Sequence, residues 1–233
     1  MRRGRRRERR AAALKGAYHR AVLTIDEVRE ALARHPGKQI EDRARPRAAV
    51  AVVLRESAVG PEVLLIERAR HPEDPWSGHM AFPGGRVDPG DPHAQAAAER
   101  ETLEEVGLSL ARAELLGRLD DIEGRHAGRT LPLVISAHVF HHPAAGALRL
   151  NHEVASALWV PMERLVDPAY HVAHPTPIGD YPGIFVGDRS ERDPREGIDE
   201  SDPLHHVVWG LTYRFLELFL ERLGHPLPAR WTR

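Results

Sequence analysis

The segment from Gly84 to Leu108 constrains the chain most, because it places three glutamates within about one turn of an expected helix. The pair Asp91-Pro92 predicts the start of this helix, since aspartate is a good N-cap and proline suits the first helical position. Gly107 predicts its end, because glycine readily adopts the left-handed conformation that stops a helix. A glycine-containing loop, Gly84-Gly85, therefore precedes a helix with an acidic C-terminal half.

The three glutamates of this helix are Glu101, Glu104 and Glu105. Residues at positions i, i+3 and i+4 share one helix face, so their carboxylates should project together and repel one another. A hard divalent cation that prefers oxygen ligands relieves this repulsion, and Mg²⁺ commonly binds substrate phosphate as well. An acidic cluster taken alone is more typical of a solvated helix face. Leu103, Val106 and Leu108 are expected to anchor the helix in the core.

The surrounding residues resemble the Nudix box: Gly, five residues, Glu, seven residues, then Arg-Glu-apolar-x-Glu-Glu-x-Gly-apolar. From Arg100 to Leu108 the match is complete except that Thr102 takes an apolar position. Counted from Gly85, Asp91 takes the place of the first glutamate, and eight residues rather than seven separate it from Arg100.

This resemblance implies an α/β fold, a Nudix-type α/β/α sandwich with a mixed central sheet. It also implies Mg²⁺- or Mn²⁺-dependent hydrolysis of a diphosphate linkage in a nucleoside diphosphate derivative. Glu101 and Glu105 correspond to the principal metal ligands of the family, and Glu104 to a further ligand or the base. Gly85 corresponds to a glycine whose carbonyl helps to bind metal, and Arg100 to an arginine that orients a glutamate.

The sequence does not identify the general base. Glu101 and Glu104 are the first choices, and four acids outside the box are further candidates: Asp120, Asp121, Glu123 and Glu153. The expected substrate-binding residues are Gly84, Gly85 and Arg68. Arg68 is a candidate phosphate contact, although an exposed arginine at a strand end is a comparable interpretation.

Several segments outside the box look like the coenzyme A diphosphatase branch of the family. These segments are Leu64–Arg68, Phe82–Gly85, Leu158–Pro161 and Val208–Thr212. The similarity implies coenzyme A or acyl-coenzyme A as substrate. The branch expects an arginine and a histidine where this chain has residues 74–78, which leaves ADP-ribose, nucleotide sugars or another nucleotide as alternatives. A silent nucleotide-binding Nudix domain is a further alternative, but such domains typically lose box glutamates that this chain keeps.

The remaining hydrophobic pattern predicts strands and helices intermixed around one sheet. A capping box, Thr24 to Glu27, begins a helix that should stop near His35. Strands are expected at 48–54, 63–66, 79–82, 114–119, 131–140 and 157–160, a long functional loop at 166–205, and a last helix at 208–223. Residues 1–20 are expected to form a basic, disordered arm, and residues 21–233 a single Nudix hydrolase domain.

Composition narrows the function classes. The chain has no cysteine, which excludes disulfides, thiolate metal sites and cysteine nucleophiles. Its formal net charge of −1 argues against nucleic acid as the partner of the whole surface, despite seven arginines among the first ten residues. No apolar run approaches the length of a bilayer span, so we expect no membrane association and a cytoplasmic location. We expect a small-molecule nucleotide as the binding partner. The sequence does not determine the oligomeric state, and a homodimer is one of the alternatives.

Overall fold

The structure is a computed structural model, and its main sheet is mixed. The described residues are 23–42, 44–71, 76–126, 129–176, 179–187 and 206–227, so the basic arm expected at residues 1–20 lies outside them. The strands of this sheet are β1 Arg47–Ser57, β2 Gly60–Arg68, β3 Met80–Ala81, β4 Gly84–Arg86, β5 Glu114–Arg118, β6 Ile122–His126, β7 Arg129–His141 and β8 Val154–Pro161. The central strands β1 and β7 run parallel, whereas the other strand pairs are antiparallel.

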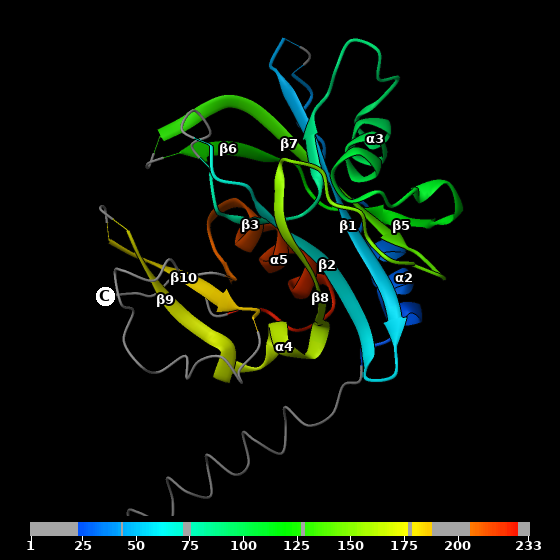
Figure 1. Cartoon of the computed structure of the whole chain (residues 1–233), viewed down its shortest axis with the longest axis vertical. Coiled ribbons are helices and arrows are strands. Elements are labelled where there is room, and N and C mark those ends of the chain that lie inside the picture. Colours follow the sequence, from blue (N-terminus) through cyan, green and yellow to red (C-terminus); the bar gives the residue numbers. More distant parts are fainter. Residues whose placement is uncertain are drawn as a thin grey trace, which may run out of the picture.

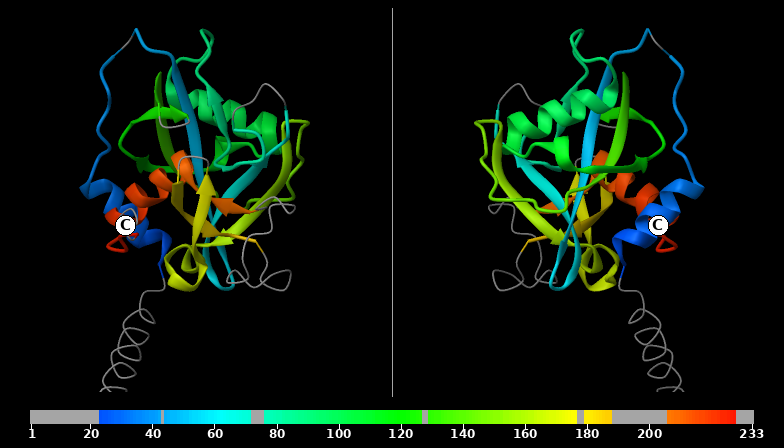
Figure 2. Two further views of the ribbon diagram at one scale, coloured as in Figure 1. Left: turned by 90° about the vertical axis from the view of Figure 1, so that its left-hand side faces the viewer. Right: turned by 90° about the vertical axis from the view of Figure 1, so that its right-hand side faces the viewer.

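Helices cover both faces of this sheet. Helix α3 (Ala94–Val106) lies on one side, and α2 (Ile25–Arg34) and α5 (Gly210–Arg222) lie on the other (Figures 1 and 2). Alternating side chains of β1 supply both cores, because successive residues of a strand point to opposite faces. Ala51 belongs to the cluster on the α3 side, and Val52 to the cluster that holds Phe219 of α5. The expected α/β/α arrangement with a mixed sheet is therefore confirmed.

Local signals explain several element boundaries. The side chain of Thr24 accepts a hydrogen bond from the Glu27 amide at 3.2 Å, and the Glu27 carboxylate accepts from the Thr24 amide at 2.9 Å. This reciprocal pair is the predicted capping box, and α2 ends one residue before His35 as expected. The hairpin of β1 and β2 is also confirmed, with Ser57 opposite Gly60.

The prediction of one long loop over residues 166–205 is wrong for its first half. After α4 (Met162–Val166) and a 3₁₀ turn, η2 (Pro168–Tyr170), two strands follow: β9 His171–Thr176 and β10 Gly179–Phe185. With β11 (Val207–Val208) they form a three-stranded sheet. The proline, glycine and histidine content hid these strands, because most of their side chains are only partly buried and the burial shows no clean alternation. Residues 188–205 lie outside the described residues.

The edge strands β4 and β6 were also missed. β4 contains two glycines, which have low strand propensity, and β6 contains mostly polar residues. Both strands exist because a longer neighbour supplies the pairing: β4 pairs with β1, and β6 pairs with β7. None of the helices in the described part of the chain is long and apolar enough to span a membrane.

Candidate active site

Two glycines allow the acidic helix to approach the sheet closely. Gly84 has φ 151°, and a side chain there would overlap the backbone of β1 at Ala49 and Val50. A side chain at Gly85 would overlap the carboxylate of Glu101. The pair therefore joins β4 to β1 on one side and admits a carboxylate of α3 on the other.

The two ends of α3 agree only in part with the predictions. The helix stops at Gly107, which has φ 68° and donates its amide hydrogen to the carbonyl of Leu103, as predicted. The prediction of Asp91 as the N-cap is wrong, because the helix begins at Ala94 and His93 caps it by accepting from the amide of Ala96 at 3.1 Å.

Asp91 is instead the principal partner of Arg100. Arg100 donates from Nε to Oδ1 of Asp91 at 3.1 Å and from Nη2 to Oδ2 at 3.0 Å, and this bidentate pair lowers the pKa of Asp91. A charge-assisted pair of this kind is stronger than one bond to a helix amide, which explains why Asp91 faces the arginine. Nη1 of the same arginine also donates to Glu101 at 2.9 Å and to Glu104 at 3.1 Å. These contacts fit the orienting role that the family resemblance implies for Arg100.

The three glutamates have different environments. Glu105 is buried, its Oε2 accepts from the Gly84 amide at 2.8 Å, and burial raises its pKa to about 7. Glu101 is partly buried, and its pKa is also raised, mainly by burial and against the influence of Arg100. Glu104 is exposed and faces Arg100. Glu101 and Glu105 therefore form the inner pair of the site, and Glu104 lies at its rim.

A fourth carboxylate, Glu153, lies beside this inner pair. Its negative charge contributes to raising the pKa of both Glu101 and Glu105. The loop before β8 brings it there: the Asn151 amide donates to the carbonyl of Glu105 at 2.9 Å, and the side chain of Asn151 accepts from the Glu153 amide at 2.8 Å. No spacing rule in the sequence connects Glu153 to the box, since the link runs through a loop that pairs with the end of α3.

The other three acids proposed as outside candidates lie in ion pairs elsewhere. Asp120 binds Arg222, Asp121 binds Arg47 and Arg118, and Glu123 binds Arg45. By contrast, Arg68 at the end of β2 lowers the pKa of Glu105 through its charge. Of the outside residues proposed from sequence, the structure thus brings only Arg68 and Glu153 to the glutamates.

The helix presents its core face differently from the prediction. Val106 and Leu108 are buried as expected, whereas Leu103 is 51% exposed, so its predicted anchoring role is wrong. Thr102 is fully buried in its place and donates its hydroxyl to the carbonyl of Ala98 at 2.7 Å. This internal bond satisfies the hydroxyl, which is why a polar residue fits the position where the family pattern has an apolar one.

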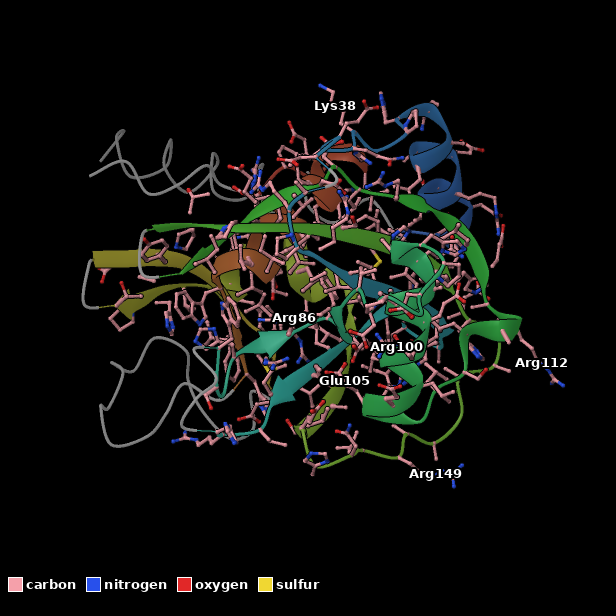
Figure 3. The ribbon with its side chains drawn as sticks, turned by 90° about the horizontal axis from the view of Figure 1, so that it is seen from above. Lys38, Arg86, Arg100, Glu105, Arg112 and Arg149 are labelled. Carbon is pink, nitrogen blue, oxygen red and sulfur yellow. The ribbon has the colours of Figure 1, made fainter. Side chains whose placement is uncertain are left out.

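The chemistry of the inner pair suits a hard divalent cation. Glu101 and Glu105 offer carboxylate oxygens, the ligands that Mg²⁺ and Mn²⁺ prefer, and burial disfavours their charged forms unless a positive charge lies nearby. Within the described ranges, no group of three or more His, Asp or Glu side chains is arranged around a common point as a complete metal cage. Figure 3 shows Arg86, Arg100 and Glu105 at the junction of β4 and α3. The residues present fit a metal held by two carboxylates together with backbone, water or substrate oxygens.

Comparison with known proteins agrees with this geometry. The model of the NUDIX domain matches residues 45–179, which include α3 and every strand of the main sheet. The chain belongs to the Nudix family. The match begins two residues before β1 and ends at the start of β10, so the second sheet extends beyond the part that the Nudix model covers.

Relatives support the same family. The chain is 30% identical over 184 residues to the uncharacterised Nudix hydrolase NudL of Citrobacter koseri, covering 77% of this chain and 84% of that protein. It is 43% identical over 112 residues to an uncharacterised Schizosaccharomyces pombe protein, covering 46% of this chain and only 34% of the yeast protein. It is 26% identical to Nudix hydrolase 3 of Caenorhabditis elegans, covering 58% of this chain and 56% of that protein. The chain thus spans about a third to a half of the length of these two eukaryotic relatives.

Among solved structures, one similar chain is the Ap4A hydrolase of C. elegans in a binary complex. It has a TM-score of 0.43 and 23% identity, and the alignment covers 52% of this chain and 83% of that one.

Proposed function

We propose that this Nudix protein hydrolyses a diphosphate linkage in a nucleoside diphosphate derivative and depends on Mg²⁺ or Mn²⁺. One observation carries the proposal: Glu105 is buried against the Gly84 amide beside Glu101, and burial raises the pKa of both side chains. A structural core has no use for two such carboxylates, because burying charge without a partner destabilises the fold. A divalent cation and the phosphates it binds account for their retention.

The roles of the side chains follow from their contacts. Glu101 and Glu105 would hold the metal, which when bound neutralises phosphate charge and polarises water. Arg100 fixes the Glu101 carboxylate at 2.9 Å, and Asp91 fixes Arg100 through two hydrogen bonds. Arg68 is close enough to Glu105 to influence its pKa and would contact a substrate phosphate. Glu104, at the rim, remains a further ligand in this proposal.

Glu153 is our choice for the general base. The residue is exposed, its backbone is anchored by Asn151, and its charge acts on both inner glutamates. A base in this position would take a proton from the water that attacks phosphorus. The new phosphorus–oxygen bond forms as the bridging phosphorus–oxygen bond breaks, which releases two phosphorylated products. Glu104 is less suited, because its carboxylate is occupied by Arg100.

Coenzyme A or an acyl-coenzyme A is the proposed substrate. The motive is the similarity of Leu64–Arg68 and Val208–Thr212 to the coenzyme A diphosphatase branch. The second segment lies next to β3, the strand that precedes the glycine loop, since the hydroxyl of Thr212 donates to the carbonyl of Met80 at 3.0 Å. We further propose that residues 21–233 form one domain, which is supported by a core cluster that contains residues from both sheets and from α2 and α5.

A comparative hydrolysis assay tests this function. Turnover is measured on coenzyme A, an acyl-coenzyme A, ADP-ribose and nucleotide sugars, with Mg²⁺, with Mn²⁺ and after chelation. We expect metal-dependent cleavage with coenzyme A compounds preferred. A clearly higher catalytic efficiency on another compound would contradict the assignment to the coenzyme A branch. The broader proposal of a diphosphate hydrolase would still hold. Binding of these compounds without cleavage of any of them would identify a silent nucleotide-binding domain.

A further inference from the structure

The loop before β8 is held to the end of α3 by two backbone hydrogen bonds. The Arg149 amide donates to the carbonyl of Val106 at 2.8 Å, and the Asn151 amide donates to the carbonyl of Glu105 at 2.9 Å. The last carbonyls of a helix have no partner within the helix, so the loop satisfies two groups that would otherwise need water. Glu105, one of the inner pair of glutamates, is thereby bonded directly to the loop that carries Glu153.

Gly107 allows the loop to approach the helix. A side chain at this position would lie 3.1 Å from Cβ of Arg149 and 3.2 Å from its carbonyl oxygen. Contacts this short would push the loop away from the end of α3. The last glycine of the box therefore has a second use besides stopping the helix, because its missing side chain admits the loop.

Asn151 connects the helix end to Glu153 as well. Its side-chain oxygen accepts from the Glu153 amide at 2.8 Å, in the turn that asparagine commonly forms with the backbone two residues on. On the other side, the Glu153 carbonyl accepts at 2.8 Å from the amide of Ala69, the residue after Arg68. Both backbone groups of Glu153 are thus bonded, one to the residue that holds Glu105 and the other to the residue beside Arg68.

The side chain of Glu153 has no comparable support. The residue is exposed, and within the described ranges its carboxylate accepts no hydrogen bond and forms no ion pair. The position of its backbone therefore limits where the carboxylate can lie, since only the side-chain torsions remain free. Of the two contacts that fix this backbone, only the one from Asn151 comes from a side chain, so it depends directly on the residue type.

We propose that Asn151 is a positioning residue for the hydrolysis and that it fixes the Glu153 carboxylate relative to Glu101 and Glu105. The inference rests on the proposed function and on Glu153 as the general base. The backbone of Asn151 ties the loop to the end of α3 that carries the inner pair, and its side chain orients the backbone of Glu153. Glu153 takes the proton of the attacking water, and Asn151 acts only through Glu153. A catalytic group displaced from its productive geometry loses much of its effect on the rate.

A double-mutant cycle tests the proposal on the full chain. Turnover of coenzyme A, or of ADP-ribose if that is the better substrate, is measured at saturating Mg²⁺ for the unaltered chain, Asn151→Ala, Glu153→Gln and the double variant. Asn151→Ala should lower kcat about tenfold with little change in KM, and Glu153→Gln should lower it about a hundredfold or more. In the Glu153→Gln background, Asn151→Ala should lower kcat by less than about twofold, because no base is left to position.

Two further variants separate this role from a structural one. Asn151→Ser keeps an oxygen that can accept from the Glu153 amide, so it should recover a large part of the turnover. His152→Ala changes an exposed side chain of the same loop and should keep normal turnover. Thermal melting shows which variants are folded. If Asn151→Ala is not folded, Asn151→Gln takes its place in the cycle, since its longer side chain does not form the same turn.

The possible failures are distinguishable. An equal effect of Asn151→Ala with and without the Glu153 carboxylate would show that Asn151 acts on the fold or on the metal ligands. That result, or normal turnover of Asn151→Ala, would overturn the proposal. Normal turnover of Glu153→Gln would reject Glu153 as the base and the inference with it, while hydrolysis by the unaltered chain would still support the proposed function. If the unaltered chain hydrolyses none of the diphosphate compounds, the proposed function itself is rejected together with the inference.

Discussion

Two charged clusters on the α3 side of the main sheet have opposite imbalances. At the C-terminal half of α3, the carboxylates of Glu101 and Glu105 have a raised pKa and Glu153 adds a further negative charge nearby. In the other cluster, Arg47 and Arg118 share the one carboxylate of Asp121. His93, the N-cap of α3, is close enough to this second cluster for its charge to contribute to lowering the pKa of His138.

The two clusters differ in how their charges are balanced. In the acidic cluster, the carboxylates outnumber Arg68 and Arg100, and this excess of oxygen ligands suits a hard cation. In the basic cluster, Asp121 accepts from both arginines and from the Ser136 hydroxyl, so the arginines are paired within the protein. Two glycines let the acidic helix approach the sheet closely, whereas Nε of Arg118 and Nε2 of His138 in the basic cluster are buried. The proposed catalysis therefore involves the first cluster, whereas the ion pairs of the second concern the stability of the fold.

The largest expected effect is on turnover in the acidic cluster. Glu105→Gln should lower metal-dependent turnover at least about a hundredfold, because the loss of one ligand charge weakens binding of the cation that stabilises the transition state. The protein should stay folded, since glutamine is neutral, fits the same space and can still accept from the Gly84 amide. Turnover and thermal melting are measured together, with Glu99→Gln on the same helix, at a position that the box leaves variable, as control. Near-normal turnover of the folded Glu105→Gln protein would show that the site is assigned wrongly.

A smaller effect is expected on stability in the basic cluster. The pKa of His138 is lowered from its ordinary value to about 4 by burial, so the folded state disfavours the protonated ring. Its contribution to stability is fully present above about pH 6.5 and is lost as the pH falls towards 4, on the order of 2 kcal/mol. Chemical denaturation at several pH values and constant ionic strength measures this loss. His138→Gln should flatten the dependence in that window, and the exposed His152→Gln should not; identical curves for the two variants would exclude His138 as the cause.

The link between Asp91 and Arg100 should affect turnover by about tenfold. Asp91→Ala removes both hydrogen bonds that fix Arg100, so the Glu101 carboxylate loses its orientation while the metal ligands themselves remain. Asp91 also accepts from the Asp88 amide at 2.8 Å, but a glutamate can keep the pair with Arg100. Asp91→Glu should therefore recover most of the turnover, and the main change should be in kcat. The exposed Asp88→Ala, whose carboxylate lies 3.7 Å from Arg100, is the matched control. If Asp91→Ala and Asp88→Ala lower turnover equally, Asp91 is not the residue that orients Arg100.

The same two clusters explain what could be predicted from the sequence. The residues of the box are close together along the chain, so their helical spacing predicted the shared face of Glu101 and Glu105 and the stop at Gly107. The neighbour Arg68 ends β2 and Glu153 lies in the loop before β8, and the pairing of β2 with β8 and the bond of Asn151 to Glu105 bring them to the site. The basic cluster gave no signal at all, because Arg118 and His138 meet through the register of β5 and β7. Local periodicity predicts helices and their faces, but it does not predict which strands become neighbours.

The smallest expected effect tests the face of the helix that connects the two clusters. Leu103 is 51% exposed, so Leu103→Gln should change the free energy of unfolding by no more than about 0.5 kcal/mol. Val106, fully buried on the same helix, gives the contrast: Val106→Ala removes core methyl groups and should destabilise by more than about 1 kcal/mol. Chemical denaturation of the two variants measures both values. A large loss for Leu103→Gln would mean that this face of α3 is covered in solution, and the inner position of Glu105 relative to Glu104 would then need to be assigned again.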